Sequence, residues 1–408
     1  MKRILFVLIW VANASYCQIY TPSHGSITID SKGLTGGRNG YIDSTSLVIG
    51  QNSFANNLFS YFNLAIGQSS LTKHFSGDYN TAIGYESLTS DTNGFSNLGL
   101  GYKTLNKNKT GYYNIAIGDK AMQENIKGSE NIAIGSSALF NNIGDANTAI
   151  GMFALFGNIW GYDNIAIGPY SLFKNTTGLY NTAIGVSSLF TNDNGEGNTG
   201  IGFGAVSSNT TGKYNTGVGV RALEWNQAGG SNTAIGYNAG LGVTSGTKNT
   251  FLGMGTYSTM DFDNSTVIGA YAFVNASNKV RIGDANVTVI EGQVAWSYPS
   301  DRRLKENIQY TSRLGLNFIN KLQTVSYNYI ADKTHVRHDG FIAQDVEKVM
   351  QELGVDFSGL KKADDGTYSL AYSDFVMPLV NAVKEQQKEI DELKKQVKAL
   401  IKAQNNKQ

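Results

Sequence analysis

The sequence predicts a mainly β protein, in which a parallel β-solenoid, or β-roll, of ~17-residue repeats precedes an α+β domain that ends in a coiled-coil helix. Three observations support this fold class. A five-residue motif that closes on glycine recurs at a nearly constant step through most of the chain, the composition changes near residue 299, and a heptad pattern occupies the C-terminus.

The repeated motif reads Asn, then Thr, Ile or Leu, then usually Ala or Gly, then Ile, Leu or Val, and finally Gly, as in NTAIG at Asn80. Its closing glycines stand at 67, 84, 101, 118, 135, 151, 168, 185, 202, 219, 236 and 253, so the step is 17 residues with a single step of 16. Gly50 extends the series upstream, and Gly269 and Gly283 extend it downstream. Fifteen units are therefore expected, within residues 46–283.

Each motif fits a short β-strand. Its second and fourth residues share one face of the strand, and the third faces the other way. A unit of 17 residues is too short for a helical hairpin, and a glycine in every unit disfavours helix. We expect one coil per unit, with the Ile and Leu positions stacking coil on coil in a rod on the order of 70 Å long.

The N-terminus predicts export. Two cations precede an apolar run from Ile4 to Ala12, and small residues follow at positions suited to signal peptidase. The run covers about half of the ~20 residues that a bilayer span needs. Lipidation of Cys17 is the alternative, but a lipoprotein signal has a small residue before the cysteine and here Tyr16 stands there. We expect a signal peptide at 1–17 and an N-terminal cap at 18–45.

Acidic residues are sparse in the repeats and vary in place, whereas glycan hydrolysis usually needs two carboxylates at a fixed separation. We interpret them as solvated turn residues: Glu86, Asp119, Asp145, Asp163 and Glu196. Calcium-binding turns of the G-G-x-G-x-D type are missing, and the Thr ladder lacks the second Thr that would favour ice binding. Aromatic residues recur after the glycines and in the turns; core or interface packing is favoured over a sugar-stacking surface for Tyr85, Tyr102, Phe153, Tyr170, Phe203 and Tyr237.

The N-x-A-I-G unit followed by S/A-L resembles the head repeat of trimeric autotransporter adhesins, over about Ser46 to Gly283. The resemblance implies a β-roll assembled from three chains. The period here is a few residues longer than in that family.

Charge density rises abruptly after the repeats. Residues 300–408 hold 17 Lys/Arg and 15 Asp/Glu, which leaves 16 and 17 for the 299 residues before them. The net charge of +1 gives no sign of a nucleic-acid partner. The change of composition therefore marks a second domain after a linker at 284–299.

Three blocks of this second domain resemble the intramolecular chaperone domain of phage tailspikes and endosialidases, peptidase family S74. They are SDRRLKENI from Ser300, DGFIAQDVEKVMQELG from Asp339 and the segment Tyr368 to Leu400. The resemblance implies that three chains associate through residues 300–375, that this domain helps the upstream β-rich part to fold, and that self-cleavage then releases it. The matching bond is Pro299–Ser300.

The chemistry of that cleavage points to Ser300, Lys305 and Asp301. The Ser300 hydroxyl lies one residue from the Pro299 carbonyl and needs a base to take its proton. Lys305 stands where the family places its base, and Asp301 would orient one of these groups or cap the following element. Residues five apart on one helix cannot face each other, so either a turn lies between Ser300 and Lys305 or the Lys of one chain serves the Ser of another. Without the resemblance, these residues would be interpreted as a helix cap and a solvated cation.

The C-terminal segment 376–404 predicts a coiled coil. Its apolar residues follow a heptad pattern with alternating steps of three and four, in which Gln386 takes the one polar position. They are Val376, Leu379, Val383, Ile390, Leu393, Val397 and Leu400. A single amphipathic helix packed on its own domain is the alternative. The types of residue along this heptad seam favour a coiled coil of two helices, so the expectation of three chains comes from the resemblances.

No cofactor and no metal site is expected. His335 and His338 have the spacing of a ligand pair but no third ligand nearby. The sequence thus predicts an exported homotrimeric fibre with an adhesin-like rod for a cell-surface glycan or protein and a self-cleaving serine peptidase domain. A polysaccharide-degrading enzyme and an uncleaved structural spacer remain the alternatives.

Overall fold

The computed structural model describes residues 17–20, 26–30, 33–35, 46–56, 59–294, 296–330 and 335–406. The chain divides into two compact units, Met1–Ile282 and Gly283–Gln408. The division falls next to the predicted end of the repeats. The predicted signal peptide lies outside the described residues except for Cys17.

A small antiparallel sheet opens the first unit. It joins β1 (Cys17–Tyr20), β2 (Ser26–Asp30) and β3 (Gly33–Thr35) in that order. These strands fall in the region expected to cap the rod.

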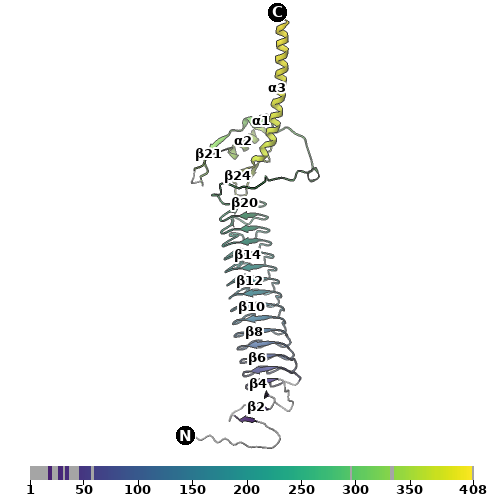
Figure 1. The fold of residues 1–408 in the computed structure, drawn as a ribbon, viewed down its shortest axis with the longest axis vertical. Helices are drawn as coiled ribbons and strands as arrows, with labels where there is room; N and C mark the ends of the chain where they lie inside the picture. The colour runs from purple at the N-terminus through teal and green to yellow at the C-terminus, as the bar shows by residue number, and fades with distance from the viewer. Residues whose placement is uncertain are drawn as a thin grey trace. The chain divides into compact units, whose positions relative to one another are not determined.

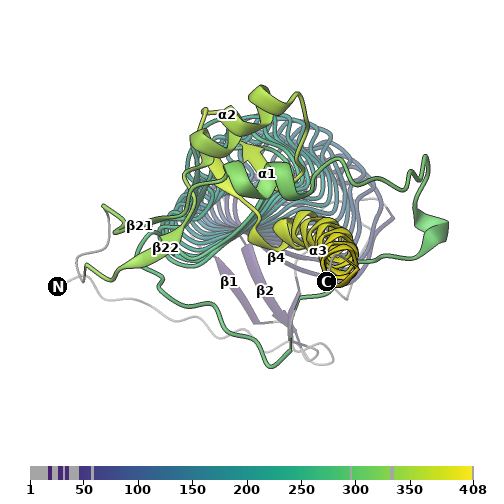
Figure 2. The same cartoon turned by 90° about the horizontal axis from the view of Figure 1, so that it is seen from above.

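Fifteen parallel strands then stack in chain order into one sheet, as Figure 1 shows. They are β4 (Leu47–Ile49), β5 (Leu64–Ile66), β6 (Thr81–Ile83), β7 (Leu98–Leu100), β8 (Ile115–Ile117), β9 (Ile132–Ile134), β10 (Thr148–Ile150), β11 (Ile165–Ile167), β12 (Thr182–Ile184), β13 (Thr199–Ile201), β14 (Thr216–Val218), β15 (Thr233–Ile235), β16 (Thr250–Leu252), β18 (Thr266–Ile268) and β20 (Val280–Ile282). Two shorter strands, β17 (Tyr257–Ser258) and β19 (Phe273–Val274), pair beside them. Equivalent motif residues are adjacent, for example Thr182 with Thr199, and the coils superpose when viewed along the stack (Figure 2). The predicted parallel β-solenoid is confirmed.

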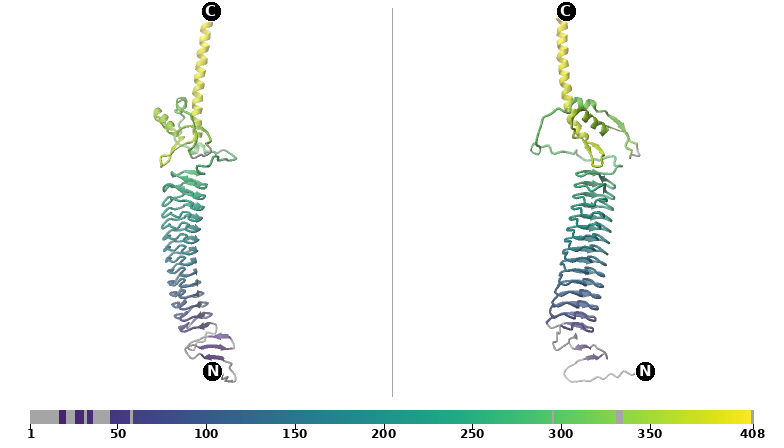
Figure 3. Two further views of the ribbon diagram at one scale, coloured as in Figure 1. Left: turned by 90° about the vertical axis from the view of Figure 1, so that its left-hand side faces the viewer. Right: turned by 180° about the vertical axis from the view of Figure 1, so that it is seen from behind.

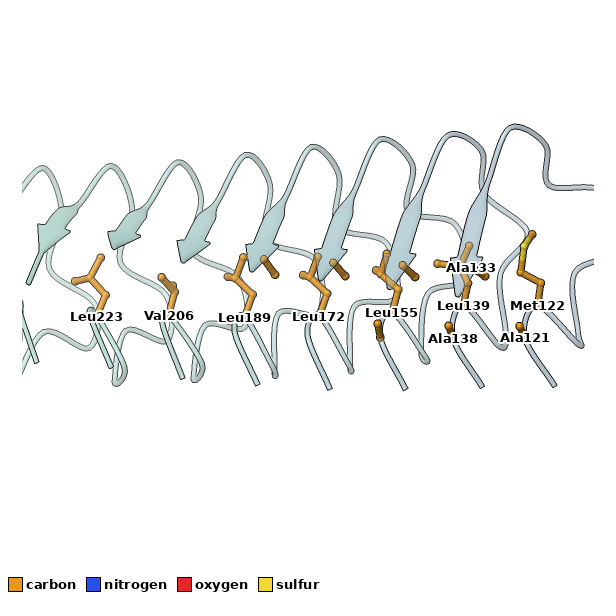
Figure 4. Close-up of a cluster of buried hydrophobic side chains, with 14 of the residues drawn as sticks. Ala121, Met122, Ala133, Ala138, Leu139, Leu155, Leu172, Leu189, Val206 and Leu223 are labelled. Carbon is orange, nitrogen blue, oxygen red and sulfur yellow. The ribbon is translucent and has the colours of Figure 1, made fainter. Parts of the chain in front are cut away.

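The core of the rod is narrow and consists mainly of Ala and Leu. The middle residue of each strand from β5 to β16, and of β18, is buried, and Ala116, Ala149 and Ala183 are fully buried. In the coils from Gly67 to Gly219, the residue four positions after the closing glycine is a fully buried Leu, Met or Val, and Figure 4 shows Leu155, Leu172 and Leu189 aligned from coil to coil. The Ile positions stack as well, but on the opposite, solvent-facing side of the sheet. Leu and Ile thus form two separate ladders, and only the Leu ladder belongs to the core.

From Gly50 to Gly253, the closing glycine of each motif is required by both its backbone angle and the next coil. Gly118 has φ +125°, and a Cβ there would lie 2.7 Å from the carbonyl oxygen of Gly135 in the next coil. The buried Leu also has a positive φ, for example 50° at Leu189, which costs about 1–2 kcal/mol. Full burial of a Leu side chain contributes ~1.5–3 kcal/mol, so burial outweighs the backbone cost.

Buried asparagines run through the rod in two columns. In the first column, the motif asparagines, Asn97 donates its backbone N–H to Asn80 Oδ1 at 3.0 Å and its side-chain amide to Gly111 O at 2.8 Å. The second column comprises the fully buried Asn108, Asn125, Asn142, Asn158, Asn175, Asn192, Asn209 and Asn226. Its amides donate from coil to coil, as Asn175 does to Asn158 Oδ1 at 2.8 Å. The columns thereby give hydrogen-bond partners to buried backbone N–H and C=O groups, which would have none in a purely apolar interior.

The single 16-residue unit interrupts the second column at one step. The missing residue lies between Asn142 and the next glycine, so the Asn142 amide donates to Gly144 O at 2.7 Å. As a result Asn125 Oδ1 is buried without a hydrogen-bond partner.

The second unit has α+β structure around a small aromatic core. Its elements are the 3-10 turn Arg302–Leu304, α1 (Leu316–Lys321), β21 (Val325–Tyr327), β22 (His338–Gly340), α2 (Ala343–Leu353), β23 (Leu360–Lys362), β24 (Tyr368–Leu370), a second 3-10 turn Tyr372–Phe375 and α3 (Val376–Asn405). Phe318, Val346, Val349, Phe357 and Phe375 form the core. The expected α+β domain with a long terminal helix is confirmed.

The first turns of α3 belong to this domain. Pro378 and Ala382 are buried, Asn381 donates to Leu314 O at 3.2 Å, and Glu385 Oε2 accepts the N–H of Leu316 at 2.7 Å. Glu385 therefore holds the first turn of α1. The rest of α3 extends away from α1 and α2 in every view of this unit (Figures 1 and 3). Within the described residues, no helix is both long and apolar enough to cross a membrane.

Candidate functional site

The structure brings Ser300 and Lys305 together within one chain. Lys305 Nζ lies 2.7 Å from Ser300 Oγ and donates a hydrogen bond to it. The 3-10 turn Arg302–Leu304 lies between them and reverses the chain. Of the two arrangements that the spacing allowed, an intervening turn is thus present in the single chain.

Asp301 caps this turn, and its side chain hydrogen-bonds to Arg303 and not to Ser300 or Lys305. Its Oδ1 accepts the backbone N–H of Arg303 at 2.8 Å, and its Oδ2 pairs with Arg303 Nη2 at 2.6 Å. The side-chain hydrogen bond from Arg303, followed by the backbone one, lowers the pKa of the Asp301 carboxyl. Asp301 therefore shapes the turn that places Lys305 beside Ser300.

Ser300 and Lys305 are both exposed in the single chain. Pro299 and Leu304 beside them are exposed as well. The two side chains are close enough for proton transfer, with Lys305 as the donor of the hydrogen bond, but nothing in the described chain shields them from water.

His335 and His338, which have the spacing of a metal-ligand pair, make other contacts in the structure. His338 lies in β22 and its ring contacts Tyr327 and Tyr329, with centroids 5.9 and 5.2 Å away. The carbonyl of His335 accepts a hydrogen bond from Asn328 at 2.7 Å. Across the described ranges, no group of three or more His, Cys, Asp or Glu side chains could hold a metal ion.

Acidic residues of the rod are mostly engaged by the neighbouring coil. Glu86 pairs with Lys103 at 3.5 Å, Glu196 pairs with Lys213 at 2.9 Å, and Asp145 accepts the N–H of Ser129 at 2.8 Å. These contacts agree with their interpretation as solvated turn residues.

The outward face of the long sheet is free of charge. We call it the aliphatic face, and it comprises the first and last residues of β4 to β16, β18 and β20. The last residue is always Ile, Leu or Val, and the first is Thr, Leu, Ile or Val. Ile134 is 36% exposed and Leu252 44% exposed. A continuous apolar stripe along a whole sheet is typical of a protein–protein interface.

A second apolar stripe lies on α3. The predicted seam residues are all exposed, from 44% at Ile390 to 69% at Leu400. The buried residues of α3, Pro378 and Ala382, lie off this seam. The helix therefore packs on its own domain through one face and leaves the heptad seam open for another helix.

A buried pair that the sequence analysis missed opens the second asparagine column. His74 Nδ1 lies 2.7 Å from Asp91 Oδ2, His74 Nε2 lies 2.8 Å from Gly77 O, and Asp91 Oδ1 accepts from Asn108 at 2.7 Å. Burial raises the pKa of the Asp91 carboxyl, although its hydrogen bonds oppose this. The pair occupies two successive positions of the column, and the 17-residue spacing of His74 and Asp91 was the signal for it.

Residues 300–355 match the model of the peptidase S74 family, described as chaperone of endosialidase. The match begins at Ser300 and covers the first two blocks of the resemblance, while the third block lies beyond it. A search of curated proteins returned no match. A chaperone domain of this family preceded by a parallel β-solenoid fits a protein similar to fibres and tailspikes.

Proposed function

We propose that this chain is one subunit of an exported homotrimeric fibre, whose C-terminal domain aligns three chains and then releases itself by cutting the Pro299–Ser300 bond. The observation that carries the proposal is the 2.7 Å contact between Lys305 Nζ and Ser300 Oγ, at the first residue of the family match. The rod would then act as an adhesive element for a cell-surface glycan or protein.

The cleavage would proceed through an ester. With the amine neutral, Lys305 takes the hydroxyl proton while Ser300 Oγ attacks the carbonyl carbon of Pro299 through a five-membered ring. The C–N bond breaks, and the Ser300 nitrogen receives the proton from Lys305. Water then hydrolyses the ester, which leaves a carboxylate on Pro299 and a free amine on Ser300.

Assembly would control this step. Both side chains are exposed in the single chain, and a second chain docked over the turn would exclude water from them. Cleavage would then follow correct assembly, so a chain that failed to find partners would keep its chaperone.

Two unpartnered apolar surfaces support the trimer. The aliphatic face offers an uncharged contact along the rod, and the open seam of α3 offers a coiled-coil contact. The contacts between three parallel stacks join different chains, so they can form only after the chains have met. A long helix forms quickly and raises the effective concentration of the attached rod segments to the millimolar range.

Mass analysis of the exported protein tests the proposal. We expect a fragment that begins at Ser300 in the wild type, and intact chains for both Ser300→Ala and Lys305→Ala. Arg302→Ala, in the same turn but outside the pair, is the matched control and should still cleave. Intact wild-type chains would instead favour a permanent spacer.

Native mass of the Ser300→Ala protein tests the trimer separately. We expect three chains per particle. Single chains with an intact rod would contradict the assembly role.

A further inference from the structure

Residues 284–299, which we call the strap, carry many exposed apolar side chains in their described part. Among the described residues of this segment only Asp284 and Glu291 are charged. Its large apolar side chains are 47–82% exposed and comprise Val287, Val289, Ile290, Val294, Trp296 and Tyr298. So many exposed apolar residues in one short segment predict a protein contact.

The backbone of the strap is also unpaired. Within the described part of the chain, residues 288–294 and 296–299 form no hydrogen bond with any other residue. Val294, Trp296 and Tyr298 alternate along the chain, so they would share one face of an extended strand. An exposed strand with free N–H and C=O groups is a template for pairing with another chain.

The strap begins with an ordered turn. Asn286 donates its backbone N–H to Asp284 Oδ1 at 3.0 Å, and a Cβ on Gly283 would lie 2.4 Å from Val287 Cγ2. This turn starts immediately after β20, the last strand of the aliphatic face. Three rods joined through that face would therefore start their straps at one level.

We propose that each strap pairs with the straps of two other copies of this chain and keeps the trimer locked after cleavage. This inference rests on the proposed trimer. Identical tethered segments that start at one level reach a high effective concentration for one another, which favours them over a foreign partner. The strap lies upstream of the Pro299–Ser300 bond and remains with the rod, whereas α3 leaves with the released domain.

The lock also has a structural purpose at the end of the stack. A terminal coil has a neighbour on one side alone, so solenoids fray from their ends unless these are capped. Loss of α3 would remove the contact that aligned the chains. The strap would replace it with a contact that stays attached to the rod.

Paired variants test the lock. In Val294→Ser/Trp296→Ser we expect normal cleavage, followed by dissociation of the released trimer at least about tenfold faster than in the wild type, measured by exchange with labelled subunits. Tyr310→Ser is the matched control, because Tyr310 is 92% exposed but lies on the released side of the bond. Equal exchange rates for the strap variant and the wild type would overturn the inference.

Quenching of Trp296 tests the pairing without cleavage. In a Ser300→Ala chain with Trp10, Trp160 and Trp225 changed to Phe, Trp296 is the one remaining tryptophan. We expect acrylamide to quench it several-fold less in the native protein than in urea, although it is 81% exposed in the single chain. A native trimer with fully quenched Trp296 would reject the strap and leave the proposed function standing, and single chains with an intact rod would reject both.

Discussion

The rod and the C-terminal unit are stabilised in opposite ways. In the rod, each coil contacts its two neighbours, and the interior combines Ala, Leu and hydrogen-bonded Asn that repeat from coil to coil. In the C-terminal unit, a few aromatic rings form one local core, with Phe357 and Phe375 centroids 4.6 Å apart. Rod stability is therefore distributed along the stack and depends on register, whereas the C-terminal unit depends on a compact cluster.

This difference suggests a division of labour. A stack is held together by contacts between neighbouring coils, because a single coil cannot bury its faces alone. The C-terminal core joins residues farther apart in the chain, since Leu316 and Glu385 are 69 positions apart, and α3 extends from it with an open seam. The C-terminal unit is thus suited to bring chains together through α3, whereas neighbouring coils determine the register within each rod.

The largest expected effect comes from a closing glycine. Gly118→Ala combines an unfavourable φ with a clash against the next coil, and we expect a loss of about 4 kcal/mol or more in the free energy of unfolding. Gly354→Ala in the C-terminal unit is the control, because its φ is also positive but no atom lies within 4 Å of the added Cβ. We expect about 1 kcal/mol there. Urea unfolding followed by circular dichroism measures both, and equal losses would contradict the dependence on stacking.

The buried pair should give the second largest effect. His74→Ala leaves the Asp91 carboxyl buried without its imidazole, at a cost of about 3 kcal/mol. His74→Asn/Asp91→Asn should remain within about 1 kcal/mol of the wild type, because two asparagines would extend the second column. Thermal unfolding of the two variants separates these outcomes. A double variant as unstable as His74→Ala would show that the column cannot continue into these coils.

The broken step of the second column offers a finer comparison. Asn175→Ala removes the donor to Asn158 Oδ1 and the acceptor of Asn192, at a cost of about 2 kcal/mol. Asn125→Ala should cost about 1 kcal/mol less, since Asn125 Oδ1 already lacks a partner. Denaturant midpoints measured side by side test this order, and the reverse order would refute the hydrogen-bond account.

The smallest effect on the fold is expected on the aliphatic face. Ile201→Lys changes an outward residue that is 36% exposed, so the coil itself should lose less than about 1 kcal/mol. The trimer should nevertheless weaken, because three lysines would enter an uncharged contact. Thr211→Lys adds the same charge to an exposed position of the same coil outside this face. Sedimentation should show dissociation for Ile201→Lys and none for Thr211→Lys; similar behaviour of the two would exclude this face as the interface.

The glycine series predicted the position of all fifteen strands, because each strand ends immediately before a glycine with a positive φ. Alternation correctly placed the third motif residue opposite the second and fourth. It could not show which side is the interior. The interior accepts the small Ala methyl, and the larger Ile is left outside.

At the candidate site, the five-residue spacing of Ser300 and Lys305 predicted that a turn or a second chain was needed. The choice of the turn depends on Asp301, whose carboxylate binds the backbone and side chain of Arg303. The catalytic roles of Ser300, Lys305 and Asp301 stay predictions that the mass analysis addresses.

The sequence by itself determined the repeat, the strand positions and the change of domain near residue 299, because these depend on local backbone geometry and composition. The tertiary structure alone decided which ladder is buried, how the asparagine columns connect and that His74 meets Asp91. Those contacts join residues about one coil apart, and they exist only when neighbouring coils stack in register, so that the side chains of one coil complete the hydrogen bonds of the next.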